Sequence, residues 1–492
     1  MRRPTLLLIL MVLAVVAPVA RAAPDPAAGP DLAAIDAFVE DRMRRHGIPG
    51  IALALVRGDE VIHARGFGTD GRGQPMTADT PLFIGSVSKS FTGLAIMQLV
   101  AQGRIDRDAP VRTYLPWFEV ADPDASARIT IRHLLGHTSG LSDLRYLESL
   151  RLRDDATLEE GVRDLRRAEP VAPPGREFHY FNPNYAVLGH LVEVVSGQSY
   201  ADYLREHVFE PLDMQRTFTD PEAARAAGLA RGHLQAFGVP VPHEQPFRQH
   251  GLPAGYLMST ANDMAHYLIA MNGGGTYGDE RVLSRCGMIE LHAPNGPGGF
   301  YAHGWFVGEH RGHRLVQHGG TNEAFKTEAM LLPDDDLALV LLANQSTLPM
   351  ALFAYADLST GLLDLLVGAA PAPPPFTMRT LGAVLGVAFL LQLAFIARDA
   401  ARLPRWRARA RGWSRMRATI GVVPHFVTVP VIALVVIAAL QAWMGRGISL
   451  RQAFDGVPDL TLMLAVGFAA DLALGGWKAR ALAQDRGRVS AG

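Results

Sequence analysis

Residues 86–89, which read Ser-Val-Ser-Lys, have the residue types and spacing of a nucleophile and its activating base. They follow Gly85 and precede an apolar run over residues 91–100, which predicts that Ser86 lies at or near a helix N-terminus. Lys89 then lies one turn further along, on the same face. A serine hydroxyl is a weak nucleophile, and a nearby, partly desolvated amine can take its proton. The helix N-terminus would add N–H donors where an oxyanion forms.

The motif alone leaves a second interpretation open. Ser-x-x-Lys occurs by chance in many proteins, and a serine that only caps a helix, followed by a solvated lysine, has the same sequence. The choice between the catalytic and the helix-capping interpretation depends on further motifs along the chain and on the elements that would position Ser86 and Lys89.

Strand-like runs occur at both ends of the mixed region 31–365, with helical patterns such as 185–195 between them. Two of these runs flank the tetrapeptide 57–60, which is a hairpin signal. This arrangement predicts one α+β domain, in which both chain ends supply an antiparallel sheet and a helical region is inserted between them. The runs cover residues 51–56, 61–66, 304–307, 314–316, 328–332 and 337–342.

The first 22 residues resemble a signal peptide. Arg2 and Arg3 precede an apolar core over residues 6–16, and Ala20-Arg21-Ala22 fits a small-x-small cleavage pattern. An uncleaved membrane anchor is the alternative, and in either case the following domain is exported.

Hydrophobic residues make up 49% of the 492-residue chain, and the excess lies near its C-terminus. After a Pro-rich linker at 366–379, the region 380–480 holds three apolar segments that we expect to span a bilayer. Arginines crowd the loop after the first segment, so the positive-inside rule puts this loop and the tail 481–492 in the cytoplasm. We therefore expect a multi-pass protein of a bacterial cell membrane, in contact with lipid, whose globular domain is extracytoplasmic. The segments are about 380–397, 420–444 and 459–477.

Four motifs occur in an order that resembles the serine β-lactamase and penicillin-binding protein superfamily. They cover residues 83–89, 129–140, 180–182 and 318–320. The chain is most similar to the branch of class C β-lactamases, DD-peptidases, D-aminopeptidases and related esterases, over roughly residues 31–345. The resemblance implies a β-lactamase/transpeptidase-like fold and a serine hydrolase that acts on an amide or ester through an acyl-enzyme.

The resemblance also implies the roles of individual side chains. Ser86 would be the nucleophile, and Lys89 and Tyr180 would share the proton-handling role, with the first base left open between them. Asn182 would offer its amide to Lys89 and to a substrate carbonyl.

The fourth motif would complete the substrate-binding site. The resemblance places the oxyanion hole at the backbone N–H groups of Ser86 and Thr321, and Gly319 and Gly320 would let substrate approach the strand closely. Many relatives carry a lysine where this chain has His318. A histidine is mostly neutral at pH 7 unless an acidic group stabilises its charged form, which puts carboxylate recognition in doubt.

Other function classes receive less support. The net charge of −1 gives no reason to expect a nucleic-acid partner, and the single cysteine, Cys286, permits no intrachain disulfide. We expect no metal or cofactor, and we interpret His137 as structural. A penicillin- or peptidoglycan-sensing receptor that acylates without efficient turnover is the main alternative. The substrate, a β-lactam, a D-amino-acid peptide or a small ester, and the oligomeric state stay open.

Overall fold

The computed structural model describes residues 30–146, 152–374, 376–444 and 456–489. The predicted signal peptide lies outside the described residues, so its cleavage stays a prediction.

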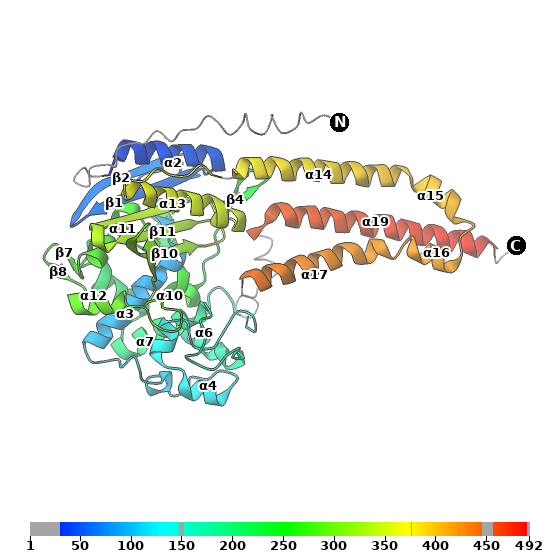
Figure 1. Cartoon of the computed structure of the whole chain (residues 1–492). Helices are drawn as coiled ribbons and strands as arrows, with labels where there is room; N and C mark the ends of the chain where they lie inside the picture. Colours follow the sequence, from blue (N-terminus) through cyan, green and yellow to red (C-terminus); the bar gives the residue numbers. More distant parts are fainter. Residues whose placement is uncertain (1–29, 147–151, 375, 445–455, 490–492) are drawn as a thin grey trace, which may run out of the picture.

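A six-stranded antiparallel sheet forms the centre of the globular domain, with strand order β2-β1-β12-β11-β10-β9 (Figure 1). Strand β1 pairs with β12 from Ile51↔Ala343 to Arg57↔Leu337, so the two ends of the domain sequence meet in the middle of the sheet. This confirms the predicted α+β fold with a sheet drawn from both ends. The strands are β1 Gly50–Arg57, β2 Glu60–Gly68, β9 Phe306–His310, β10 His313–Thr321, β11 Lys326–Leu332 and β12 Leu337–Ala343.

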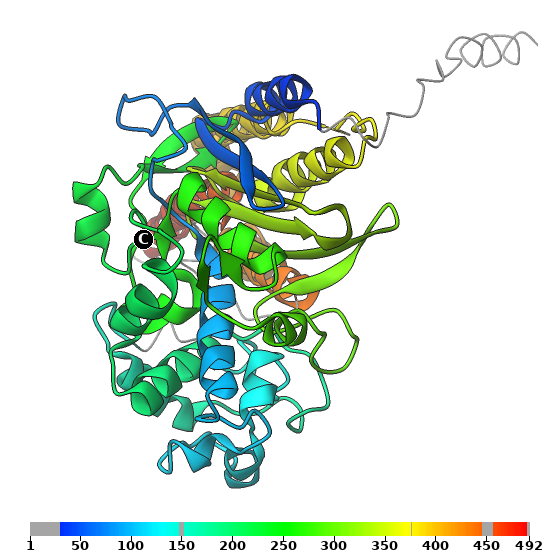
Figure 2. The same ribbon diagram turned by 90° about the vertical axis from the view of Figure 1, so that its left-hand side faces the viewer.

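Both faces of the sheet are covered, which explains why its central strands are continuous apolar runs. Helices α2 (Leu32–His46) and α13 (Tyr355–Leu366) pack on one face, and α11 (Ala261–Asn272) packs on the other. Figure 2 shows α2 and α13 on one side of the sheet and the helical region on the other.

The helical region surrounds α3 (Ser88–Ala101), whose first twelve residues are all buried. Helix α7 (Pro183–Ser196) packs against α3 and includes the predicted helix 185–195. The remaining helices of this region are short: α4 Pro123–Arg128, α5 Ile131–Leu135, α6 Leu158–Asp164, α8 Tyr200–Leu204, α9 Pro221–Ala226, α10 Leu252–Gly255 and α12 Arg285–Leu291. Three two-stranded ribbons complete it: β3 Leu82–Phe83 with β6 Met258–Ser259, β4 Gly232–Ala236 with β5 Val239–His243, and β7 Thr276–Tyr277 with β8 Glu280–Arg281.

The C-terminal helices extend away from this domain (Figure 1). Two of them are long and apolar enough to cross a membrane: α14 (Met378–Ala401) and the stretch Pro458–Asp485 of α19 (Pro458–Val489). The apolar stretch described in α17 (Pro424–Met444) is shorter, Pro424–Ala438. A tail with three membrane spans therefore stays a prediction. Helices α15 (Leu403–Ala410) and α16 (Arg415–Ile420) lie in the Arg-rich connection.

Polar contacts join the tail helices to one another and to the domain. The Asp471 carboxylate lies 2.6 Å from Nδ1 of His425, and Nε2 of the same histidine lies 2.6 Å from Nζ of Lys478, so Asp471 faces a neighbouring helix. Near the middle of α14, an apolar contact joins the tail to the domain: the Phe237 ring stacks on Phe389 with the ring centroids 5.4 Å apart.

Candidate active site

The Ser86 hydroxyl and the Lys89 ammonium meet at the start of α3. Ser86 lies in a single 3-10 turn, η1 (Gly85–Val87), that leads directly into the helix. Lys89 Nζ donates to Ser86 Oγ at 3.0 Å and to the carbonyl oxygen of Ala254 at 2.5 Å. Lys89 is fully buried while Ser86 is half-buried, so the hydroxyl is open to a substrate and the amine is not. This is the contact that the motif predicts.

Tyr180 lies over the same lysine. Its ring centroid is 4.9 Å from Lys89 Nζ, and the ring of Tyr185 on α7 is 5.7 Å from it. A cation held against aromatic faces gains electrostatic stabilisation that offsets part of the cost of leaving water. The structure therefore brings together the three residues that the resemblance implies for catalysis.

His137 holds the segment that carries Tyr180. Its carbonyl oxygen accepts from the backbone N–H of His179 at 2.8 Å, and its Nδ1 accepts from that of Phe181 at 3.2 Å. Its ring lies against the Tyr180 ring, with centroids 4.3 Å apart. Burial and the charge of Lys89 hold the pKa of His137 well below its usual range, so the ring is neutral. This confirms the expectation that His137 serves backbone groups.

The end of β10 packs directly against the turn that carries Ser86. A Cβ atom on Gly320 would lie 1.9 Å from the carbonyl oxygen of Ile84, and one on Gly85 would lie 2.6 Å from the backbone nitrogen of Thr321. Gly85 also has φ +54°, which favours glycine. Because only glycines allow this approach, the backbone N–H groups of Ser86 and Thr321 lie on adjoining segments, as an oxyanion hole built from them requires.

His318 is neutral and almost fully buried, with 1% of its surface exposed. Its Nδ1 donates to the carbonyl oxygen of Gly319 at 2.8 Å, which leaves Nε2 to accept from the Tyr301 hydroxyl at 3.3 Å. Burial and the charge of Lys89 lower the pKa of His318 to about 3. No acidic side chain is among its described partners, so the ring does not provide the cation that a substrate carboxylate would need.

Asn182 occupies the N-cap position of α7 and is half-buried. Its side chain caps no backbone N–H of that helix, so the amide is left for other groups. A bond to Lys89 and a bond to substrate stay predictions for this residue.

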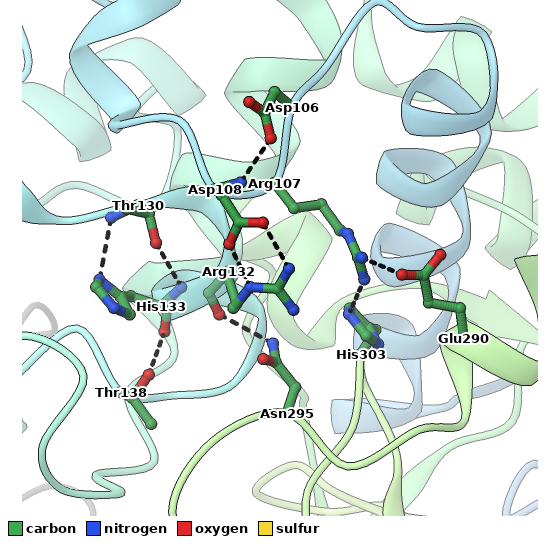
Figure 3. Close-up of polar contacts among 10 residues, drawn as sticks. All are labelled: Asp106, Arg107, Asp108, Thr130, Arg132, His133, Thr138, Glu290, Asn295 and His303. Carbon is green, nitrogen blue, oxygen red and sulfur yellow. Dashed lines mark hydrogen bonds and ion pairs between the residues drawn. The ribbon is translucent and has the colours of Figure 1, made fainter.

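Motif 129–140 includes helix α5, whose start and backbone are held by hydrogen bonds. Thr130 and His133 exchange capping bonds at the start of α5, and the Asn295 amide donates to the carbonyl oxygen of Arg132 at 3.0 Å (Figure 3). In the same view Arg107 lies between Glu290, with which it forms an ion pair, and His303.

His303, the partner of Arg107, also packs on helix α3, which carries Lys89. A Cβ atom on Gly93 of α3 would lie 2.1 Å from the carbonyl oxygen of His303, and one on Gly304 would lie 2.6 Å from that of Lys89. The segment that contains His303 and Gly304 therefore packs closely on the backbone of α3 at Lys89 and Gly93.

Three contacts of the site were missed by sequence reasoning: the Ala254 carbonyl on Lys89, the Tyr301 hydroxyl on His318, and the stacking of His137 on Tyr180. Ala254 is 165 positions from Lys89 and contributes only backbone, so no residue type marks it. Tyr301 lies in a loop before β9 with no motif around it.

A serine–lysine pair at the start of a buried helix, beside the end of strand β10 of an antiparallel sheet, is the arrangement expected of a serine acyl-transfer protein. The chain belongs to the Beta-lactamase family, whose sequence profile matches residues 35–369. Membership supports serine hydrolase or acyl-transfer chemistry in general.

Two curated relatives illustrate the match. The chain is 31% identical to penicillin-binding protein 4 of Amycolatopsis lactamdurans, over 66% of this chain and 87% of that protein. It is 29% identical to protein flp of Staphylococcus aureus (strain MW2) over 63% of this chain, and it spans only 62% of the length of flp.

Solved structures share the fold. The octameric penicillin-binding protein homologue from Pyrococcus abyssi superposes with a TM-score of 0.62 at 29% identity, covering 69% of this chain and 78% of that chain. SurE superposes with a TM-score of 0.58 at 22% identity, covering 70% of this chain and 78% of SurE.

Proposed function

We propose that this protein is a membrane-anchored, extracytoplasmic serine hydrolase that cleaves an ester or amide through an acyl-enzyme on Ser86. The observation that carries the proposal is the 3.0 Å contact between Lys89 Nζ and Ser86 Oγ. Whichever of Lys89 and Tyr180 is deprotonated, as the free amine or as the phenolate, takes the hydroxyl proton as Ser86 Oγ attacks the carbonyl carbon. The N–H groups of Ser86 and Thr321 receive the developing oxyanion. When the oxyanion collapses, the carbonyl C–O or C–N bond of the substrate breaks, and the alcohol or amine leaves with the proton taken from Ser86. Water then attacks the acyl carbon, the acid is released, and Ser86 Oγ regains a proton.

In this proposal, Asn182 binds the substrate carbonyl through its side-chain amide. The end of β10, from His318 to Thr321, binds the rest of the substrate. A neutral His318 supports a substrate that presents no carboxylate to this residue, which favours a small ester or an amide without a free acid at that position. Efficient hydrolysis of β-lactams, which carry such a carboxylate, receives less support.

The experiment uses the full chain in detergent. A fluorescent penicillin and a fluorophosphonate test for labelling, and p-nitrophenyl esters and D-Ala-D-Ala peptides test for turnover. Labelling that requires Ser86, together with turnover, supports the hydrolase. Stable labelling without turnover of any substrate supports the receptor alternative, and identical behaviour of wild type and S86A contradicts both.

A further inference from the structure

A cavity of about 290 Å³ is lined by Phe83 of β3, two residues before η1, and is rich in arginine. Arg72 comes from the loop after β2, Arg225 from α9, and Arg231 from the residue before β4. His243 of β5, which is paired with Gly232 in the β4–β5 ribbon, also lines the cavity, together with the acidic Glu244 and with Gln245. The volume is at the lower end of the range for small-molecule sites.

The positive charge of this cavity is only partly neutralised. Arg225 forms ion pairs with Glu222 and, at 3.7 Å, with Glu244. Among the described residues, neither Arg72 nor Arg231 has an ion-pair partner, and Nε2 of His243 is buried without a hydrogen bond. Three arginines from separate segments thus line one cavity, and guanidinium groups are suited to bind a carboxylate or a phosphate.

The floor of the cavity is apolar. Phe83 and Phe325 lie there with ring centroids 5.3 Å apart. Phe83 immediately precedes Ile84, whose carbonyl touches Gly320, and Phe325 follows Thr321 by four positions. Both rings therefore belong to segments that form the candidate oxyanion hole, and a ligand with an apolar body and an anionic end fits this lining.

We infer that the pocket formed by Arg72, Arg225, Arg231 and His243 binds an anionic group, carboxylate or phosphate, carried on an apolar part of the substrate. The inference rests on the proposed function, since the ligand is the substrate of Ser86. It places recognition of substrate charge at this pocket, because His318 is neutral and both of its nitrogens are already engaged.

The test uses phenyl phosphate as the probe and the full chain in detergent micelles. Calorimetric titration measures its dissociation constant for S86A and for S86A with R72Q and R231Q. Both arginines are exposed at the pocket mouth, so their replacement leaves the core intact, which a thermal melt checks. We expect the dissociation constant to rise at least tenfold in the triple variant and to rise with salt.

The matched control is S86A with R57Q, which removes an exposed arginine outside the pocket and should leave the dissociation constant unchanged. In a second arm, phenyl phosphate should inhibit hydrolysis of p-nitrophenyl butyrate by the wild type competitively. Equal binding to S86A with and without R72Q and R231Q overturns the inference, and so does the absence of competition. If Ser86-dependent hydrolysis is itself absent, the proposed function fails, and the titration still reports on the pocket.

Discussion

Two buried histidines shape the candidate site without adding charge to it. His318 and His137 each use one ring nitrogen for a backbone group, and the charge of Lys89 disfavours protonation of both. Lys89 is thereby the cation closest to the Ser86 hydroxyl in the described contacts.

The low pKa of His318 predicts a pH dependence of stability. Its folded pKa of about 3 lies below the unfolded value near 6.5, so between these limits the unfolded chain binds more protons. Stability therefore falls as pH decreases from 6.5 toward 3, with a slope of about 1.4 kcal/mol per pH unit from one such group. In H318Q the fall in melting temperature between pH 6.5 and 4.5 should be smaller than in the wild type. An identical fall in both proteins would show that His318 is protonated in the folded state.

Replacement of His137 tests whether it positions Tyr180. H137F leaves the Phe181 N–H buried without its acceptor, which costs about 1–3 kcal/mol. It also keeps a bulky side chain at φ +54°. We expect kcat to fall at least tenfold with little change in KM. H137N, which tolerates this backbone region and keeps an acceptor, should recover part of the loss. A loss seen in KM alone would contradict the positioning role.

At this scale the sequence predicts the candidate catalytic residues but not the groups that contact and position them. Ser86, Lys89 and Tyr180 stand in motifs whose residue types have a chemical reason to occur together. The contact of the Ala254 carbonyl with Lys89 and that of the Tyr301 hydroxyl with His318 arise from tertiary packing. An alanine or a tyrosine outside any motif gives no signal of such a contact in the sequence.

At the scale of elements, the site depends on how closely β10 approaches η1. Strand β10 is held by its pairing with β9 and β11, and α3 is held by the burial of its first twelve residues. Gly320 is the point where they touch.

G320A should therefore disrupt the candidate oxyanion hole. Its Cβ would lie 1.9 Å from the Ile84 carbonyl oxygen, which forces the strand away from the turn. We expect kcat/KM for an ester to fall by about 10²-fold or more, the usual effect of losing one oxyanion donor. G308A on neighbouring β9 is the control, because its Cβ would meet no atom within 4 Å. Equal activity of the two variants would argue against this contact as the basis of the hole.

The strands of the central sheet could be predicted from the sequence better than the loops and the pocket. Hairpin β1–β2 and strands β11 and β12 follow from apolar runs bounded by turn residues, and their pairing follows from the α+β pattern. The pocket around Arg72 and Arg231 could not be predicted, since it joins separate segments whose arginines resemble ordinary surface charge.

At the scale of the whole molecule, the tail and the domain are in contact. The Phe237 backbone N–H donates to Asp459 at the start of α19, and its ring stacks on α14. The segment that supplies Arg231 and His243 thus also touches the start of α19 and the middle of α14, the two helices that could enter a membrane.

The proposed orientation makes a direct prediction for this tail. The arginines between α14 and α17 favour the cytoplasm, so a fluorescent protein fused after Arg411 should fold and fluoresce, whereas an alkaline phosphatase fused there should be inactive. A fusion after Gly368, at the end of the domain, should give the opposite pair of results. Phosphatase activity after Arg411 would reverse the proposed topology.

The central claim is that Ser86 forms the acyl-enzyme. The most direct measurement is intact and peptide mass spectrometry of the full chain quenched during reaction with an ester substrate or a penicillin. The account predicts one acyl group per chain, on the peptide that contains Ser86, and none on S86A. An acyl group on another residue, or equal acylation of S86A, would contradict it.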